Sequence, residues 1–260
     1  MKIGIVGYGK MGKIIEEIAI ERGHTIVGKY NSNNPLNDEN WEACDVAIEF
    51  TNPESAVANI EFLSSKKIPV IVGSTGWYND YLRVTEKIKS DNSAILSATN
   101  FSLGVNLFWK MAEYMSHLMQ PHTNYTIGIS EIHHTEKKDA PSGTAITLAE
   151  KVIGAQSMLK DWTLENIIHV AKSEDDINFS SPEEINFKKS NDGTLPIVAI
   201  REPHVPGTHE LHFQGEFDEI SLLHKAKNRK GFATGAVIAA EWIKDRKGVF
   251  QMSDLLKFEN

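Results

Sequence analysis

Residues that exchange protons and bind anions are concentrated between Glu131 and Thr144, where the chain holds two adjacent histidines, a lysine and a Ser-Gly-Thr step. Histidine can donate a proton near neutral pH, and a nearby lysine can hold a carboxylate. The Ser-Gly-Thr step precedes the apolar segment 145–152, which predicts a helix whose first backbone N–H groups could bind an anion. These features favour a site for a small anionic substrate that needs a proton, although a solvated polar loop before a capped helix fits the local pattern equally well. The candidate residues are His133, His134, Lys137, Gly143 and Thr144.

A second pattern, Gly7-x-Gly9-x-x-Gly12, is typical of a loop that binds a dinucleotide. It follows the apolar run 3–6, which predicts a buried strand, and it precedes apolar residues at helical spacing. The first glycine would allow a tight turn, the second would let the backbone approach a pyrophosphate, and the third would let the helix pack closely on the strand. A turn with a purely structural role is the alternative.

The acidic residue that would bind the adenosine ribose, about 20 residues beyond the glycines, is missing. The second predicted strand runs instead into Lys29 and the asparagine-rich segment 31–34, with no acid before Asp38. Neutral side chains would not repel a 2′-phosphate, and Lys29 could attract one. The segment therefore fits NADH or NADPH, and a plain polar loop is the alternative.

The predicted elements change character near residue 103. Before it, strand patterns at 3–6, 26–27, 46–48, 70–72 and 94–96 alternate with helical patterns, which predicts a parallel sheet covered on both faces. After it come a helical pattern at 103–118, strand candidates at 125–130, 196–200, 210–213 and 220–223, a polar segment at 173–193 predicted as a loop, and a last helix at 232–244. We therefore predict an α/β fold with a parallel-sheet domain and a second, α+β domain with a mixed or antiparallel sheet.

The composition excludes several classes of protein. The chain of 260 residues is 41% hydrophobic and has a net charge of −8, which fits a globular protein and gives no general attraction to nucleic acid or anionic lipid. No apolar stretch approaches the ~20 residues that a membrane span needs. Cys44 is the only cysteine, and His209 and His212 lack the spacing of a zinc-binding helix motif. We expect a cytoplasmic protein without a nucleic-acid partner, a membrane partner or a bound metal.

The segment from His133 to Thr144, with Lys137, Asp139-Ala140-Pro141 and Ser142-Gly143-Thr144 in order, closely resembles the signature of the 4-hydroxy-tetrahydrodipicolinate reductase family, also called dihydrodipicolinate reductases. Further stretches resemble the same family in the same order, so the similarity spans nearly the whole chain. These stretches are Phe50-Thr51-x-Pro53-Glu54, Gly73-Ser74-Thr75-Gly76, Asn100-Phe101-Ser102-x-Gly104-Val105-Asn106 and His224-Lys225-Ala226-x-x-Arg229.

The resemblance implies a Rossmann-like dinucleotide-binding domain of residues 1–103 and 229–260, and a substrate-binding and oligomerisation domain of residues 104–228. It implies a homotetramer in which NADH or NADPH reduces a small cyclic dicarboxylate in lysine and diaminopimelate biosynthesis. The residue matching His133 is the proton donor, and those matching Lys137, His134, Gly143 and Thr144 bind the substrate. The residues expected around the cofactor are Gly7, Gly9, Lys10, Met11, Gly12, Asn31, Phe50, Gly73, Ser74, Thr75, Ala98, Thr99, Asn100, Phe101 and Arg229.

The chain departs from many relatives in three places. Its glycine loop is one residue shorter, Asn31 stands near the position of an acid, and Pro203 stands where glycine is frequent. The alternative functions are a dehydrogenase of another small acid, such as an amino-acid dehydrogenase, and a sensor that binds a dinucleotide without turnover. Neither would need the long His-Lys-Gly-Thr motif.

Overall fold

The computed structural model describes residues 1–170, 185–188 and 192–257. The chain divides into two compact units, one made of residues 1–106 and 229–260 and the other of residues 107–228. The segment 173–193, predicted as a loop, lies mostly outside the described residues. Among the described residues, no helix combines the length and the apolar character needed to cross a membrane.

The first unit is built on a six-stranded sheet whose strand pairs are all parallel. The strands lie in the order β11-β5-β4-β3-β1-β2. Their bounds are β1 (Lys2–Val6), β2 (Thr25–Tyr30), β3 (Val46–Glu49), β4 (Val70–Val72), β5 (Ala94–Ser97) and β11 (Gly248–Phe250). The strand order reverses at β1, whose two neighbours are β2 and β3. In open parallel sheets of this kind, ligands bind beyond the carboxyl ends of the strands at such a reversal.

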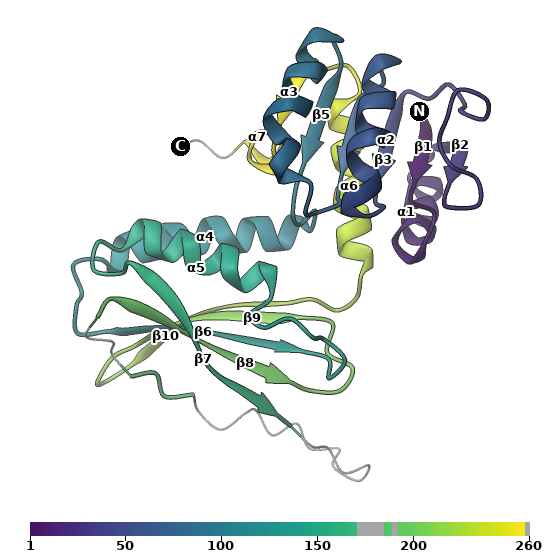
Figure 1. Ribbon diagram of the computed structural model, residues 1–260. Coiled ribbons are helices and arrows are strands. Elements are labelled where there is room, and N and C mark those ends of the chain that lie inside the picture. Colours follow the sequence, from purple (N-terminus) through teal and green to yellow (C-terminus); the bar gives the residue numbers. More distant parts are fainter. Residues whose placement is uncertain (171–184, 189–191, 258–260) are drawn as a thin grey trace. The chain divides into compact units, whose positions relative to one another are not determined.

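Helices cover both faces of this sheet (Figure 1), as the continuous apolar strands predict. One face packs against α1 (Lys10–Glu21), α6 (Lys230–Ile243) and the short α7 (Met252–Leu256). The other face packs against α2 (Pro53–Ser65) and α3 (Tyr81–Ser90), which follows the 3-10 turn Tyr78–Asp80. The helix α2 begins as its sequence predicts, because the side chain of Asn52 accepts a hydrogen bond from the backbone N–H of Ser55.

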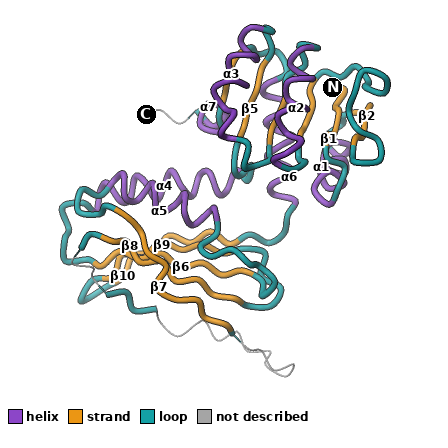
Figure 2. Tube along the Cα trace, in the orientation of Figure 1, coloured by secondary structure: helices purple, strands orange, loops and turns teal. Residues whose placement is uncertain are grey.

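The second unit holds a five-stranded mixed sheet in the order β10-β9-β6-β8-β7. Its strands are β6 (Thr126–His133), β7 (Asp161–His169), β8 (Thr194–Arg201), β9 (Thr208–Gln214) and β10 (Glu219–Lys225). The central strand β6 pairs antiparallel with β9 and parallel with β8. Figure 2 shows α4 (Leu103–Met119) and α5 (Gly143–Ala155) lying together along one face of this sheet. The predicted combination of a parallel-sheet domain with a mixed-sheet α+β domain is confirmed.

Three elements had no counterpart in the sequence prediction: β7, β11 and α7. The strand β7 is at the edge of its sheet, and the alternation of its side chains covers only residues 161–165, because the register shifts between Leu164 and Asn166 and the residues that follow are exposed. The other two are very short, with three and five residues. Their conformation depends on contacts with distant segments, such as the pairing of β11 with β5, and these contacts leave no local pattern.

Candidate active site

The candidate site lies where three strands of the second sheet bring charged side chains to one face. Glu131 and His133 are two residues apart on β6, so their side chains point to the same side of the sheet. The residue opposite Glu131 on β9 is His209, and the residue beside His133 on β8 is Arg201. All four side chains are buried. The strand register therefore concentrates an acid, two imidazoles and a guanidinium at the end of β6.

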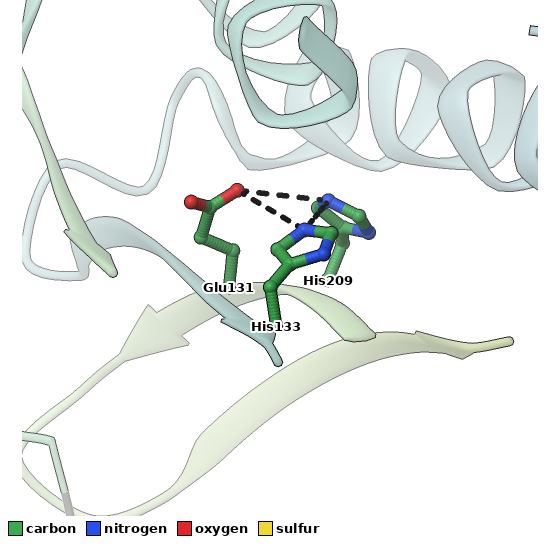
Figure 3. A group of neighbouring side chains, drawn as sticks. All are labelled: Glu131, His133 and His209. Carbon is green, nitrogen blue, oxygen red and sulfur yellow. Dashed lines mark hydrogen bonds and ion pairs between the residues drawn. The ribbon is translucent and has the colours of Figure 1, made fainter. Parts of the chain in front are cut away.

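The acid and the two histidines form a tight cluster (Figure 3). The Nε2 atom of His133 lies 3.4 Å from Nε2 of His209 and 3.5 Å from Oε2 of Glu131. The same carboxylate oxygen lies 3.8 Å from Nε2 of His209. Both imidazoles thus direct the same ring nitrogen toward one carboxylate.

The amino terminus of α5 joins this cluster through Ser142. The Ser142 hydroxyl oxygen accepts the N–H of Ala145 at 3.2 Å, which caps the helix, and lies 3.0 Å from Nε2 of His209. The backbone N–H of Ser142 donates to Oε2 of Glu131 at 3.0 Å. The predicted helix start at this step is confirmed. A Cβ atom added to Gly143 would meet no atom within 4 Å, so the first turn of α5 borders open space in which an anion could bind.

Two groups of the cluster have strongly shifted pKa values. Burial by itself would raise the pKa of Glu131, but hydrogen bonds from His133 and Ser142 outweigh it and lower the pKa to about 2. Burial lowers the pKa of His209 to about 3, and the neighbouring charge of His133 contributes to this lowering. At neutral pH, Glu131 is therefore a carboxylate and His209 is a neutral imidazole.

The shifted pKa of His209 predicts a loss of stability in acid. Unfolded histidine titrates near 6.5, so below that pH the unfolded chain binds a proton at His209 that the folded protein does not accept until about pH 3. The stabilising contribution is therefore present above pH 6.5 and is lost as the pH falls from 6.5 toward 3, by on the order of 4 kcal/mol. Denaturant titrations at pH 7.5 and 4.5 should show a clearly smaller drop in unfolding free energy for His209→Gln than for the parent. An equal drop in both proteins would contradict the burial argument.

The lysine of the motif lies in the loop after β6, and Arg201 binds the backbone of this loop. Lys137 places its Nζ atom 2.7 Å from a carboxylate oxygen of Asp139, whose side chain is 63% exposed. The Arg201 guanidinium donates to the backbone carbonyls of Lys137 at 3.3 Å and Asp139 at 2.9 Å, and it lies 3.6 Å from Oε1 of Glu131. Because an exposed ion pair is weak, a bound anion can compete with Asp139 for Lys137. His134 follows His133 directly and is half-buried, and its backbone carbonyl accepts the N–H of Lys137.

The carboxylate and the two imidazoles are close enough to consider a metal ion. However, the Ser142 hydroxyl faces the Nε2 atom of His209, and the positive guanidinium of Arg201 lies beside the carboxylate. Both contacts favour a network that shares protons, and we assign no metal. The histidine cluster considered from the sequence does not assemble, because His212 faces Ser130 on the opposite side of the sheet from His209.

The expected cofactor residues lie in the first unit, at the carboxyl ends of its parallel strands. Gly7 follows β1 with φ of +97°, and a Cβ atom there would lie 2.1 Å from the carbonyl oxygen of Phe50. A Cβ on Gly12 would lie 2.5 Å from the carbonyl oxygen of Gly7, whereas a Cβ on Gly9 would meet nothing within 4 Å. The first and third glycines are thus required by close packing. The second borders open space at the start of α1, as a pyrophosphate-binding loop requires.

The other expected cofactor residues follow β3, β4 and β5 at the same edge of the sheet. A Cβ on Gly73 would overlap the ring of Phe50, and the ring of Phe101 lies 5.9 Å from that of Phe50. Ser74 accepts the backbone N–H of Thr51 at 2.8 Å. Among all the expected cofactor residues, Lys10, Thr75, Thr99 and Arg229 are exposed, Met11 and Ala98 are half-buried, and Asn100 is buried.

The segment after β2 is a tight turn built by Asn31. Its side-chain oxygen accepts the backbone N–H groups of Asn33 at 2.9 Å and Asn34 at 3.1 Å. Lys29 is engaged elsewhere, because its Nζ atom lies 2.5 Å from Glu16 and 5.0 Å from the centre of the Tyr8 ring. The structure therefore offsets the charge of Lys29 with a carboxylate of α1.

Three residues of the buried network had no catalytic or substrate-binding role in the sequence prediction, namely Glu131, Arg201 and His209, whereas Ser142 was predicted as part of the helix start. One signal was available: Glu131 stands two positions before His133 in a strand pattern, which places both on one face. The contributions of Arg201 and His209 depend on the register of β8 and β9 against β6, and a single sequence does not reveal that register.

Comparison with known proteins gives a consistent result. The family model described as "Dihydrodipicolinate reductase, N-terminus" matches residues 1–101, and "Dihydrodipicolinate reductase, C-terminus" matches residues 104–256. The 4-hydroxy-tetrahydrodipicolinate reductase of Christiangramia forsetii is 42% identical over 98% of this chain and 98% of its own. The enzyme of that name from Archaeoglobus fulgidus is 31% identical, over 99% of this chain and 100% of its own.

Solved structures show the same fold. The dipicolinate-bound dihydrodipicolinate reductase from Paenisporosarcina sp. TG-14 superposes with a TM-score of 0.72 at 21% identity, covering 96% of this chain and 97% of that one. The amine dehydrogenase from Mycobacterium smegmatis superposes with a TM-score of 0.57 at 12% identity, covering 96% of this chain and 94% of that one.

Proposed function

The chain belongs to the dihydrodipicolinate reductase family, and from this premise we propose how its residues divide the work of the reaction. The protein is an NAD(P)H-dependent oxidoreductase that reduces 4-hydroxy-tetrahydrodipicolinate to tetrahydrodipicolinate in lysine and diaminopimelate biosynthesis. The two other functions considered from the sequence, a dehydrogenase of another small acid and a non-catalytic dinucleotide sensor, are not favoured by this membership.

We propose His133 as the proton donor. The observation that carries this role is its position: it is the last residue of β6, packed against the Glu131 carboxylate and close to the start of α5. Imidazole is the side chain best suited to donate a proton at neutral pH. Conversion of the 4-hydroxy substrate to tetrahydrodipicolinate takes up one hydride and one proton and releases the 4-hydroxyl as water. His133 supplies the proton at the place where the substrate's anionic groups would be held.

The substrate's two carboxylates are assigned to Lys137 and to the amino terminus of α5. Lys137 is held in place through its backbone by Arg201, and its partner Asp139 is exposed enough to yield to a dianion. The backbone N–H groups of Gly143 and Thr144 belong to the first turn of α5, where the helix dipole favours a negative charge. His134 completes this proposed substrate-binding set.

The cofactor is assigned to the first unit, which makes the second unit the substrate-binding domain. When bound, NADH or NADPH supplies the hydride. The open space at Gly9 and the amino terminus of α1 fit a pyrophosphate, and the loops after β3, β4 and β5 border the same edge of the sheet. Residues 1–103 with 229–260 thus form the proposed dinucleotide-binding domain, and residues 104–228 the proposed substrate-binding and oligomerisation domain.

Cofactor choice is predicted to be relaxed, because Asn31 neither repels a 2′-phosphate nor binds both ribose hydroxyls as a carboxylate would. We expect the parent to prefer one cofactor by at most about tenfold in kcat/KM, or roughly 1.4 kcal/mol. In Asn31→Asp the carboxylate still accepts the N–H groups that form the turn, but it adds repulsion against the phosphate. The NADH-to-NADPH ratio of kcat/KM should therefore rise about tenfold at constant ionic strength.

The control is Asn92→Asp, which adds the same charge at an exposed position after α3. No change in Asn31→Asp would show that this turn does not contact the ribose.

We also propose a cytoplasmic homotetramer. An exposed apolar stripe on α4 supports self-association: Met111, Tyr114 and Leu118 share one helix face and are 51%, 64% and 56% exposed. The parent is expected to have about four times the chain mass of 29.0 kDa in analytical ultracentrifugation. Met111→Glu combined with Leu118→Glu should yield smaller species, whereas Leu82→Glu, on exposed α3, should not. A tetramer that survives the double substitution would exclude this stripe as an interface.

A coupled assay tests the function. The substrate is generated in the cuvette by its synthase, and the absorbance of the reduced cofactor is followed. Oxidation should require both the synthase and this protein, and amino acids should not replace the cyclic substrate. Turnover with amino acids alone would instead identify an amino-acid dehydrogenase, and binding of cofactor without turnover would identify a sensor.

A further inference from the structure

The buried carboxylate of Glu131 lies beside the proposed proton donor and has no place in the mechanism so far. Its side chain is fully buried, and its Oε2 atom accepts the N–H of Ser142 and faces Nε2 of His133. Burying a charged side chain costs free energy unless hydrogen bonds or an oppositely charged partner compensate it. Arg201 offsets part of its charge from the Oε1 side, at 3.6 Å.

The contacts of this cluster leave the Glu131 carboxylate as an acceptor for His133. The Ser142 hydroxyl oxygen accepts the N–H of Ala145 and lies 3.0 Å from Nε2 of the neutral His209. A hydroxyl can donate to this nitrogen or accept from it, so either tautomer of His209 fits the contact. A carboxylate only accepts, so in both tautomers Glu131 can bind an N–H on Nε2 of His133, as the contacts in Figure 3 show.

We propose that Glu131 is a positioning residue that binds the Nε2 proton of His133, favours the positively charged imidazolium before transfer, and leaves Nδ1 as the nitrogen that gives its proton to the substrate. This inference rests on the proposed role of His133. It assigns the buried network a function that neither the sequence motif nor the strand pattern indicates: the Ser142 N–H holds the carboxylate beside His133.

The other charged and titratable groups around the cluster do not favour a positive charge on His133, so Glu131 is the group that does. Arg201 from β8 and Lys137 from the loop after β6 are positive, and they disfavour a further positive charge. His209 from β9 is neutral, and burial lowers the pKa of His224 on β10, so it too is neutral at pH 7. Among the described residues, Glu131 is the acid in ion-pair contact with His133.

The test is Glu131→Gln. Glutamine keeps the volume and, with its oxygen in the place of Oε2, can still accept the Ser142 N–H, but it carries no negative charge to favour a proton on Nε2 of His133. The variant should show a kcat about 10- to 100-fold lower than the parent. The decline of its activity at high pH should begin about one pH unit or more below that of the parent. The KM for substrate and the affinity for pyridine-2,6-dicarboxylate should change less than about threefold. Glu210→Gln, the same change on a neighbouring residue of β9, is the control and should leave the pH profile unchanged.

Two results would overturn the inference. One is parental activity in Glu131→Gln, and the other is reduced activity with an unchanged pH profile, which would mean a merely structural role. If Glu131→Gln does not fold, solid-state NMR of the parent labelled with [15N]histidine tests the same contact, and a proton on Nε2 of His133 is expected. A His133 ring that carries its only proton on Nδ1 would refute the inference. Loss of activity in His133→Gln together with an unmoved pH profile in Glu131→Gln refutes this inference alone, whereas full activity in His133→Gln refutes the proposed function of His133.

Discussion

His133→Gln is expected to lower kcat of the reduction by about 100-fold or more, the usual effect of losing a general acid. Glutamine is similar in length to histidine and can still contact the Glu131 carboxylate, so the buried network should remain folded. Binding of NADH or NADPH should change less than about twofold, because the glycine loop belongs to the other unit. The measurement is steady-state turnover with enzymatically generated substrate, together with cofactor binding by fluorescence titration.

The chain offers a matched control for this substitution. His212 is as buried as His133, each being 8% exposed, and it lies in the same sheet but contacts Ser130 on the opposite face. His212→Gln should therefore retain turnover within a fewfold of the parent. If both variants lose activity equally, burial of a polar residue in this sheet is what matters, and the assignment of the proton donor to His133 fails.

Lys137→Ala is expected to lower kcat/KM about 10- to 100-fold, with both a lower kcat and a higher KM. A charge-assisted hydrogen bond to a carboxylate is worth roughly 1.5–3 kcal/mol, and its loss also loosens the position of the ring relative to the proton donor. The affinity for pyridine-2,6-dicarboxylate, a planar ring with two carboxylates, should fall in parallel. Competition experiments should place this inhibitor at the substrate site of the parent.

The neighbouring Lys138 provides the control for charge. It is exposed, whereas Lys137 is half-buried and its loop backbone is held by Arg201. Lys138→Ala should change kcat/KM less than about twofold. An equal effect of the two substitutions would mean that the loop attracts the dianion through its general charge, and Lys137 would lose its specific role.

Local patterns were sufficient to predict most of the fold. The alternation of apolar strands with helices predicted the parallel sheet, and Asn52-Pro53 predicted the start of α2, because these signals lie within a few consecutive residues. The edge strand β7 has a weaker signal, since its alternation of half-buried and exposed residues ends at the register shift after Leu164 and its last residues are all exposed.

The candidate site was predictable only in part, for a related reason. The proposed proton donor and the helix start at Ser142 lie within one motif: residue type and spacing predict the helix start, and the family resemblance implies the role of His133. The partners His209 and Arg201 are more than 60 residues away and reach the motif through strand pairing. Lys29 shows the same limit, because its proximity in sequence to the turn at Asn31 suggested a phosphate contact, while its side chain pairs with Glu16.

This protein transfers hydride to a cyclic dicarboxylate, and the most direct measurement follows that hydride. The parent protein is supplied with synthase-generated substrate and reduced cofactor carrying deuterium at the transferable position of the nicotinamide ring, and the product is examined by mass spectrometry. Tetrahydrodipicolinate carrying one deuterium per cofactor oxidised is the predicted result. Cofactor oxidation without deuterium in the ring product, or no ring product at all, would contradict the claim.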